Sequence, residues 1–96
     1  MIRHICMFKL NEENKEANIA EFCARAESLK AIPQIRKFAA VTNDKATPDS
    51  NYEVSLIIDF DSVDDLNIYQ AHPIHKEFGA FVGTIRKERA CIDYEF

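Results

Sequence analysis

The sequence predicts an α+β domain in which a four-stranded antiparallel sheet carries helices on one face. Three observations lead to this prediction. Residues 2–10 and 89–96 alternate between two faces, as β-strands do. Apolar residues recur at helical spacing in two separate segments between these strands. The chain has 96 residues, 47% of them hydrophobic and only two of them glycine, so its length and composition suit one compact domain over residues 1–96.

The first half of the chain predicts a strand, a helix and a second strand. The helix begins after Asn14, a residue typical of N-caps, and carries one apolar stripe. It ends before Pro33, because the residue before a proline is displaced from the α region. A second strand then fits residues 35–42. In the first strand, one face is formed by Ile2, His4, Cys6, Phe8 and Leu10, and the other by Arg3, Ile5, Met7 and Lys9.

The second half repeats this order. After a polar loop at 43–51, residues 52–60 alternate as a third strand. Ser62 followed by Asp65 resembles a capping box and opens a short helix. His72-Pro73 interrupts that helix, and a new helix begins at Pro73 and extends to about Val82, because proline is favoured at the first helical position. The alternating tail forms the fourth strand.

This order, βαββαβ, is that of the ferredoxin-like fold. The sheet of such a fold has a second face that its own helices do not cover, and here that face is too apolar to remain in water. We therefore expect a two-fold symmetric homodimer in which two open faces pack into an α/β barrel. The residues expected on this face are Ile5, Met7, Ile35, Ala39, Val41, Ile57, Ala90, Ile92, Tyr94 and Phe96.

Charge and composition exclude several classes of partner. Twelve basic and sixteen acidic residues leave a net charge of −4, with no basic run that could neutralise a row of phosphates, so nucleic acid is not expected. No apolar stretch is long enough to predict a membrane segment or a secretion signal. Cys6, Cys23 and Cys91 are odd in number and widely spaced, which favours reduced thiols and a cytoplasmic location.

Five polar side chains are predicted to gather between the sheet and its helices. His4 belongs to the helix-facing side of the first strand, and His72 and His75 flank Pro73 at a helix start. Tyr69 precedes them by one turn, and Asp93 points under the same helices. A phenol, imidazoles and a carboxylate can perform general acid/base chemistry without a cofactor. The positive end of the helix dipole also favours the neutral, basic form of His75.

Other interpretations of these residues stay open. A histidine facing an apolar layer can be a hydrogen-bonded core residue, and His72 can be a capping side chain. The His-x-x-His spacing could also direct two imidazoles at a metal ion, with His4 or Asp93 completing the set. No cysteine or glutamate stands at a supporting spacing, so neither a metal nor another cofactor is expected. Arg36 could contact an anionic substrate group or be a solvated edge charge.

Several motifs together resemble one family. They are the segment 2–10, the Phe-x-Ser junction at 60–62, the Tyr-x-x-His-Pro-x-His run at 69–75 and Ile92-Asp93-Tyr94. The chain is similar to the stress-responsive dimeric α/β-barrel (Dabb) domain over nearly its whole length. The resemblance implies a ferredoxin-like protomer and a dimeric barrel.

The same resemblance suggests site residues. A plant member of the family closes a linear polyketide by aldol condensation without a cofactor. Its catalytic Tyr and His match Tyr69 and His75, and its supporting residues resemble His4, His72 and Asp93. Two bulky aromatics of its first helix correspond to Cys23 and Ala26, which implies a pocket of different shape. The residues expected to contact a substrate are Phe22, Cys23, Ala26, Leu56, Ile58, Phe78 and Arg36.

These observations leave three functional hypotheses. The first is a homodimer that binds a small organic molecule and acts as a cofactor-free cyclase, lyase or isomerase, with His75 as base and Tyr69 polarising a carbonyl. The second is a non-catalytic stress-related dimer whose histidines form a buried polar network. The third is a cofactor-independent oxygenase of related fold. A cavity of roughly 300 Å³ or more beside Tyr69 and His75 would favour ligand binding, whereas fully paired polar atoms would favour the structural hypothesis.

Overall fold

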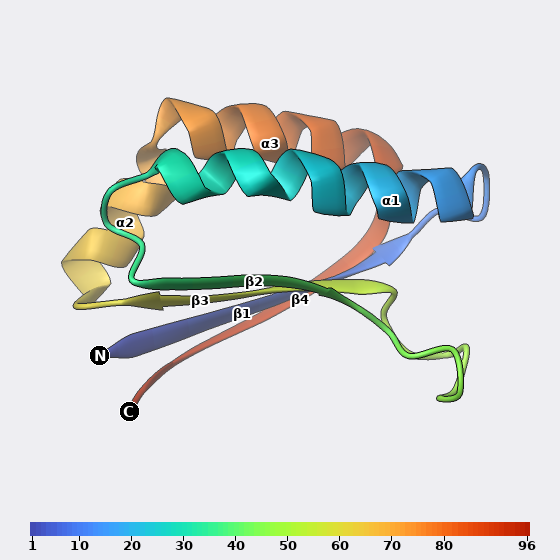
Figure 1. The fold of residues 1–96 in the computed structure, drawn as a ribbon, viewed down its shortest axis with the longest axis horizontal. Coiled ribbons are helices and arrows are strands. Elements are labelled where there is room, and N and C mark those ends of the chain that lie inside the picture. The colour runs from blue at the N-terminus through green and yellow to red at the C-terminus, as the bar shows by residue number, and fades with distance from the viewer.

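The computed structural model describes residues 1–96 and has two layers, with helices on one face of a sheet (Figure 1). Helices α1 and α3 cover the sheet, and the shorter α2 lies at one end. The two chain termini lie together, where the amide of Phe96 donates to the carbonyl of Met1 at 3.0 Å. In chain order the elements are β1 (Ile2–Leu10), α1 (Lys15–Ala26), the 3-10 helix η1 (Glu27–Ala31), β2 (Lys37–Thr42), β3 (Val54–Phe60), α2 (Val63–Ala71), α3 (Pro73–Ile85) and β4 (Arg86–Glu95).

The sheet has the order β2-β3-β1-β4, and all neighbouring strands are antiparallel. The two central strands, β1 and β3, come from the two halves of the chain, so each βαβ half contributes one inner and one edge strand. This is the topology of the ferredoxin-like fold, and the predicted fold class is confirmed. Strand register also decides which residues share the helix-facing side. His4 lies opposite Ile58 on β3 and Asp93 on β4, and Cys6 lies opposite Leu56 and Cys91.

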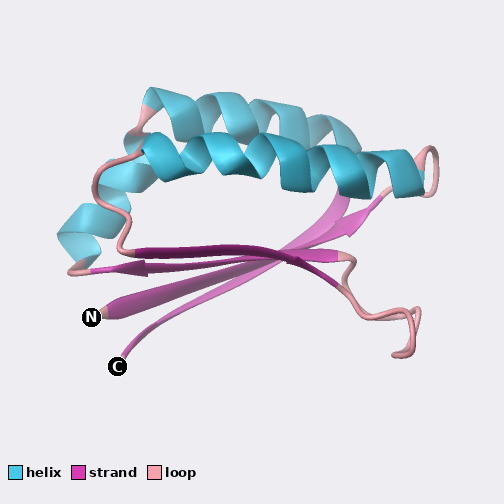
Figure 2. Cartoon of the chain, in the orientation of Figure 1, coloured by secondary structure: helices cyan, strands magenta, loops and turns pink.

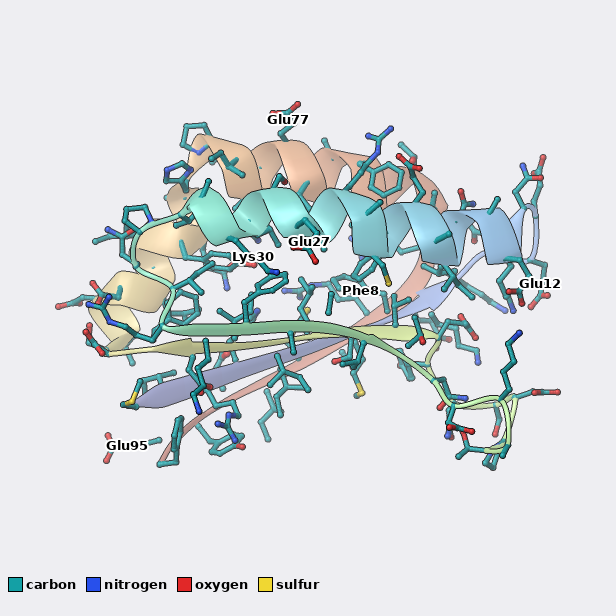
Figure 3. The ribbon with its side chains drawn as sticks, in the orientation of Figure 1. Phe8, Glu12, Glu27, Lys30, Glu77 and Glu95 are labelled. Atoms are coloured by element: carbon teal, nitrogen blue, oxygen red, sulfur yellow. A yellow bond between two sulfur atoms is a disulfide. The ribbon has the colours of Figure 1, made fainter.

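The core lies between the helices and the sheet. Alternate residues of β1 and β3 are buried there, while their neighbours point to the other face. Phe22 on α1 is fully buried and packs its ring against Phe8 and Phe78, with ring centroids 5.5 and 5.3 Å apart. Figure 3 shows Phe8 in this layer, beneath α1. The predicted apolar stripe of the first helix is therefore confirmed as a core-facing stripe.

Two details of the first half differ from prediction. Asn14 occupies the N-cap position of α1, but its side chain caps no amide, because its backbone adopts the left-handed conformation at φ 55° and ψ 29°. Asparagine is one of the residues that tolerate this region. Ile35 was expected on the open sheet face. It instead precedes β2 and packs against the core, since the chain turns at Pro33 and the strand begins only at Lys37.

The second half follows its predicted capping signals. Ser62 accepts a hydrogen bond from the Asp65 amide at 3.2 Å and so caps α2. His72 ends α2 with extended backbone, and Pro73 begins α3 at once. The Nδ1 of His72 accepts from the Ile74 amide at 3.1 Å. Helix α3 ends at Ile85 and continues directly into β4, so this strand begins three residues earlier than predicted.

The other face of the sheet carries no helix (Figure 2). Large apolar side chains are exposed on this open face, with Ile92 at 60% and Tyr94 at 39%. Its polar element is a bidentate pair in which Arg3 donates to both oxygens of Asp59, at 2.8 and 3.0 Å. These hydrogen bonds hold the pKa of Asp59 below its usual value. The Arg3 guanidinium also lies 4.4 Å from the ring centroid of Phe96.

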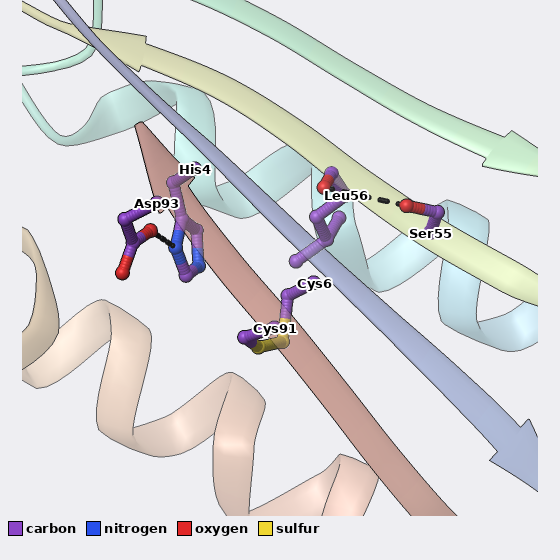
Figure 4. Close-up of a disulfide and its surroundings, with 6 residues drawn as sticks. All are labelled: His4, Cys6, Ser55, Leu56, Cys91 and Asp93. Carbon is purple, nitrogen blue, oxygen red and sulfur yellow. Dashed lines mark hydrogen bonds and ion pairs between the residues drawn. A yellow bond between two sulfur atoms is a disulfide. The ribbon is translucent and has the colours of Figure 1, made fainter. Parts of the chain in front are cut away.

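A disulfide joins Cys6 of β1 to Cys91 of β4 (Figure 4). The expectation of reduced thiols is wrong for this pair. The two residues are 85 positions apart in sequence, but strand register sets them directly opposite each other, with their Cα atoms 4.2 Å apart. Cys23 remains a free thiol, and burial raises its pKa. The cytoplasmic location rested partly on reduced thiols and stays a prediction. No helix combines the length and apolar composition of a transmembrane segment.

Candidate active site

A small cavity opens between β1, β4 and helix α3. Its volume is about 160 Å³, so the cavity does not reach the size of roughly 300 Å³ that would have favoured ligand binding and has room for a small molecule only. Three of the predicted polar residues, from three different elements, meet at its wall. The lining residues are His4, Cys6, Phe8, Leu56, Tyr69, His75, Phe78, Gly79, Val82, Arg86 and Arg89.

A hydrogen bond to Asp93 fixes the position of the His4 imidazole. The imidazole is buried, and its Nδ1 lies 2.5 Å from Oδ1 of Asp93, which stands opposite it on β4. Figure 4 shows this pair beside the disulfide. A carboxylate accepting from Nδ1–H fixes the ring orientation and leaves Nε2 as the free nitrogen. Asp93 therefore acts on the cavity through His4, because Asp93 is not among the lining residues.

Tyr69 presents a buried phenol without a partner. The residue is fully buried on α2, and its ring packs against Phe60, with centroids 5.1 Å apart. Its hydroxyl has no hydrogen-bond partner. Burial raises the pKa of the phenol well above its usual range, and the Arg89 cation opposes this only in part. The phenol is consequently protonated at neutral pH and available as a hydrogen-bond donor.

His75 lies in the first turn of α3, next to Tyr69. Its ring centroid is 4.6 Å from that of Tyr69, and the ring of His4 lies 6.1 Å from Tyr69 on another side. Burial lowers the pKa of His75 below its usual 6.5, and the Gln70 backbone carbonyl acts in the opposite direction. The Nδ1 of His75 is buried and unpaired. The residue is thus a neutral imidazole at pH 7, as the helix dipole predicted.

The remaining predicted residues fall into separate places. Leu56 and Phe78 line the cavity as expected. His72 lies outside the lining and caps α3. Arg36 lies away from the cavity and pairs with Asp61 at 2.8 Å. Four residues expected to contact a substrate are not part of the cavity lining and instead belong to or pack against the hydrophobic core: Phe22, Cys23, Ala26 and Ile58.

Two cationic residues that line the cavity were not predicted from the sequence. Arg86 and Arg89 come from the start of β4 and reach the cavity. The alternation of the tail places Arg89 on the same side as Cys91 and Asp93, so the signal for Arg89 was present in the sequence. Arg86 carried no such signal, because the sequence did not show that the strand begins immediately after α3.

The residues that could ligate a metal differ from those expected. His72 and His75 do not act together, because His72 uses Nδ1 as a helix cap. A different set, His4, Cys6 and Cys91, brings its donor atoms within 4.8 Å of one another. The two sulfurs of this set are bonded to each other, which leaves the imidazole as its one available donor.

The sequence of this chain matches the family model of the stress-responsive A/B barrel domain (Dabb) over residues 2–96. The chain belongs to the Dabb family. This match spans all four strands and the candidate site, and it confirms the predicted family. A comparison with curated proteins gave no significant match.

Solved structures similar to this Dabb protein share its fold. A dimeric protein of ferredoxin-like fold from Bacteroides fragilis is 32% identical, with a TM-score of 0.87 and coverage of 99% of this chain and 95% of that one. A dimeric ferredoxin-like protein from Thermobifida fusca is 25% identical, with a TM-score of 0.88 and coverage of 99% and 90%. The hydroxynitrile lyase of Passiflora edulis is 18% identical, with a TM-score of 0.81 and coverage of 97% and 90%. The first two are described as dimeric, which supports homodimerisation of this chain.

Proposed function

We propose that this Dabb protein binds a small carbonyl compound and acts on it as a cofactor-free acid/base catalyst of the aldolase, lyase or isomerase type. One observation carries the proposal. The hydroxyl of Tyr69 and Nδ1 of His75 are both buried without partners, in adjacent rings at the wall of one cavity. Leaving two polar atoms unpaired in a core is costly, and such groups are concentrated where a ligand completes them.

The chemistry follows from the protonation states. Neutral His75 removes a proton from the carbon next to the substrate carbonyl, and the C–H electron pair moves into an enolate whose oxygen accepts a hydrogen bond from Tyr69. A different carbon of a conjugated enolate then takes the proton, which moves the double bond, or the enolate carbon attacks a second carbonyl. In the second case a C–C bond forms, and His75 returns its proton to the new alkoxide. The reverse sequence cleaves the bond. His4 is oriented by Asp93, so its Nε2 can accept a hydrogen bond from a hydroxyl group of the substrate.

Two relatives of the fold are compatible with this chemistry. The Passiflora edulis protein is a hydroxynitrile lyase, so a lyase can be built on this scaffold. The Tyr-x-x-His-Pro-x-His run resembles that of the plant polyketide cyclase, and Tyr69 and His75 are the residues that match. The small cavity disfavours a long polyketide as substrate here.

A non-catalytic dimer is the second candidate. It is favoured by the satisfied members of the cluster, since His4 is paired with Asp93 and His72 with an α3 amide. In that case the histidines would only join the helices to the sheet. The unpaired atoms of Tyr69 and His75 argue against it.

We also propose that the dimer forms through the open sheet face. Each protomer exposes apolar side chains there, and the helices bury the opposite face. Packing two such faces would remove this surface from water and close a barrel. The cavity lies on the helix side of the sheet, so both protomers would keep a complete site.

Proton exchange tests the catalytic proposal without knowledge of the natural substrate. Acetone, acetoacetate and pyruvate are incubated with the protein in D₂O, and loss of the α-proton signal is followed by NMR. We expect exchange of at least one compound above the buffer rate, reduced about 100-fold or more by His75→Asn or Tyr69→Phe. His72→Asn, which keeps a capping group, is the control and retains the rate. No exchange above buffer with any of the three compounds would favour the non-catalytic dimer.

A further inference from the structure

We propose that Arg86 and Arg89 form an anion subsite, so that the carbonyl compound bound in this cavity carries a carboxylate. This inference names the substrate class of the proposed active site and rests on that proposed function. It goes beyond the acid/base residues, because neither arginine takes part in proton transfer.

The ion pairs of the chain single out these two residues. The protein has five arginines, and three of them are paired with a carboxylate: Arg3 with Asp59, Arg25 with Glu21 and Arg36 with Asp61, each at 2.7 to 2.8 Å. Arg86 and Arg89 have no such partner. They are also the two arginines that line the cavity. The arginines left without a carboxylate partner within the protomer are therefore those at the site.

The cavity itself offers nothing to neutralise them. No aspartate or glutamate is among its lining residues, so no carboxylate of the cavity wall pairs with them. Asp93, the acidic residue next to the wall, already accepts from His4. Two guanidinium groups beside an apolar wall make a positive hollow, which attracts an anion.

Arg89 lies close to the groups that would act on the carbonyl. It stands opposite Phe8 in the register of β1 and β4 and points to the helix side of the sheet, as Asp93 does. Burial has the larger effect on the pKa values of Tyr69 and His75, raising the first and lowering the second, and the Arg89 cation lowers both. One small molecule could thus place an anionic group at the arginines and a carbonyl at Tyr69.

Size and geometry favour a short oxo acid. A volume of about 160 Å³ corresponds to about five water molecules at roughly 30 Å³ each, which is too little for a nucleotide or a polyketide. A guanidinium binds a carboxylate through two parallel hydrogen bonds, and a carboxylate beside a carbonyl is compact. A 2-oxo or 3-oxo carboxylic acid meets both conditions.

The test compares an anion with a neutral molecule of similar shape. Pyruvate and pyruvamide differ in that a neutral amide replaces the carboxylate, and binding is followed by NMR titration of the folded protein. We expect pyruvate to bind more tightly than pyruvamide, and Arg86→Gln/Arg89→Gln to weaken pyruvate at least tenfold while leaving pyruvamide unchanged. Lys76→Gln/Lys87→Gln is the control, because it removes the same number of positive charges at residues outside the lining.

Each other outcome has a definite meaning. Equal affinity for pyruvate and pyruvamide, or equal losses of pyruvate affinity in the lysine control and the arginine variant, would overturn the subsite. Binding of inorganic phosphate with no binding of pyruvate would overturn the carboxylate assignment. Arginine-dependent binding of pyruvate without any α-proton exchange would support the subsite and count against the catalytic proposal. Exchange of pyruvate by the wild type that is unchanged in Arg86→Gln/Arg89→Gln would support the catalytic proposal and count against the subsite.

Discussion

Tyr69 is the residue whose structural and functional contributions are most clearly separable. Its ring is fully buried in the core, but its hydroxyl contributes no hydrogen bond. Removing an unpaired buried polar atom relieves a desolvation cost. We expect Tyr69→Phe to leave the free energy of unfolding unchanged or raise it by up to about 1 kcal/mol, as measured by urea denaturation, while α-proton exchange falls. If Tyr69→Phe instead lowers the free energy of unfolding, the hydroxyl has a hydrogen-bond partner inside the protein.

The buried imidazole of His75 should make both activity and stability depend on pH. Burial holds its pKa below 6.5 in the folded state, so the unfolded chain binds this proton more readily. The contribution of His75 to stability is complete above pH 6.5 and is lost as pH falls through the window between 6.5 and its folded pKa. Exchange activity should decline as the pH falls through the folded pKa, the lower end of this window, because protonation of the folded protein removes the base.

The measurement compares urea unfolding and exchange rates between pH 5 and 7.5 for the wild type and His75→Asn. In the variant we expect a flatter stability profile over this range and little exchange at any pH. An unchanged stability profile would mean that His75 does not titrate as a buried group. His72→Asn is the matched control, since it changes a histidine outside the cavity.

Sequence reasoning located the reacting residues better than the cavity wall around them. His4 and Asp93 could be placed because strand alternation fixes their face, and Tyr69 and His75 because a short helix and a capped helix meet at Pro73. The expected contacts on α1 were wrong as cavity residues. Their stripe faces the core as predicted, but helix periodicity does not tell how far α1 lies from the gap that α3 leaves above β1 and β4.

At the level of elements, His72 connects α2 to α3 and has a testable structural role. It ends one helix and caps the next through Nδ1. Loss of a cap typically costs about 1 kcal/mol. We expect His72→Ala to lower the free energy of unfolding by about that amount and His72→Asn, which can also cap, to restore most of it. If His72→Ala instead abolishes exchange without loss of stability, His72 belongs to the catalytic set.

The disulfide ties the first strand to the last. It closes nearly the whole chain into a loop, and such cross-links stabilise folded proteins mainly by restricting the unfolded state. We expect reduction, or Cys6→Ser/Cys91→Ser, to lower the free energy of unfolding by about 2–4 kcal/mol. Cys23→Ser is the control and should have little effect. Detection of three reactive thiols in the denatured, unreduced protein would contradict this bond, since one is expected.

The elements themselves were largely predictable from local signals. The Ser62 cap, the Pro73 start and the alternation of β1 each fixed a boundary or a face by short-range physics. The Cys6–Cys91 bond could not be predicted in this way, because it depends on the register between strands at opposite ends of the chain. The same holds for Ile35, whose side depends on where the chain turns after Pro33.

At the level of the whole molecule, the two faces of the sheet differ in what they carry. The helix side holds the cavity, and the open side exposes apolar residues that a monomer would leave in water. A standard interface buries about 800 Å² per partner, a modest share of the 5798 Å² of accessible surface on this protomer. Because the cavity lies on the helix side of the sheet, a dimer through the open face would leave the candidate site uncovered.

A charge placed on the open face tests this division. Ile92 on β4 is 60% exposed and lies opposite Ile5 in the strand register. In a face-to-face dimer Ile92→Glu would bury an unpaired carboxylate, whereas in a monomer the same side chain would stay hydrated. We expect the variant to sediment as a folded monomer at concentrations where the wild type sediments as a dimer. Ile68→Glu on α2 is the control, because Ile68 is 47% exposed on the helix side and should leave the dimer intact. Dissociation by the control but not by Ile92→Glu would place the interface on the helices, and would mean that dimerisation covers the mouth of the cavity rather than the back of the sheet.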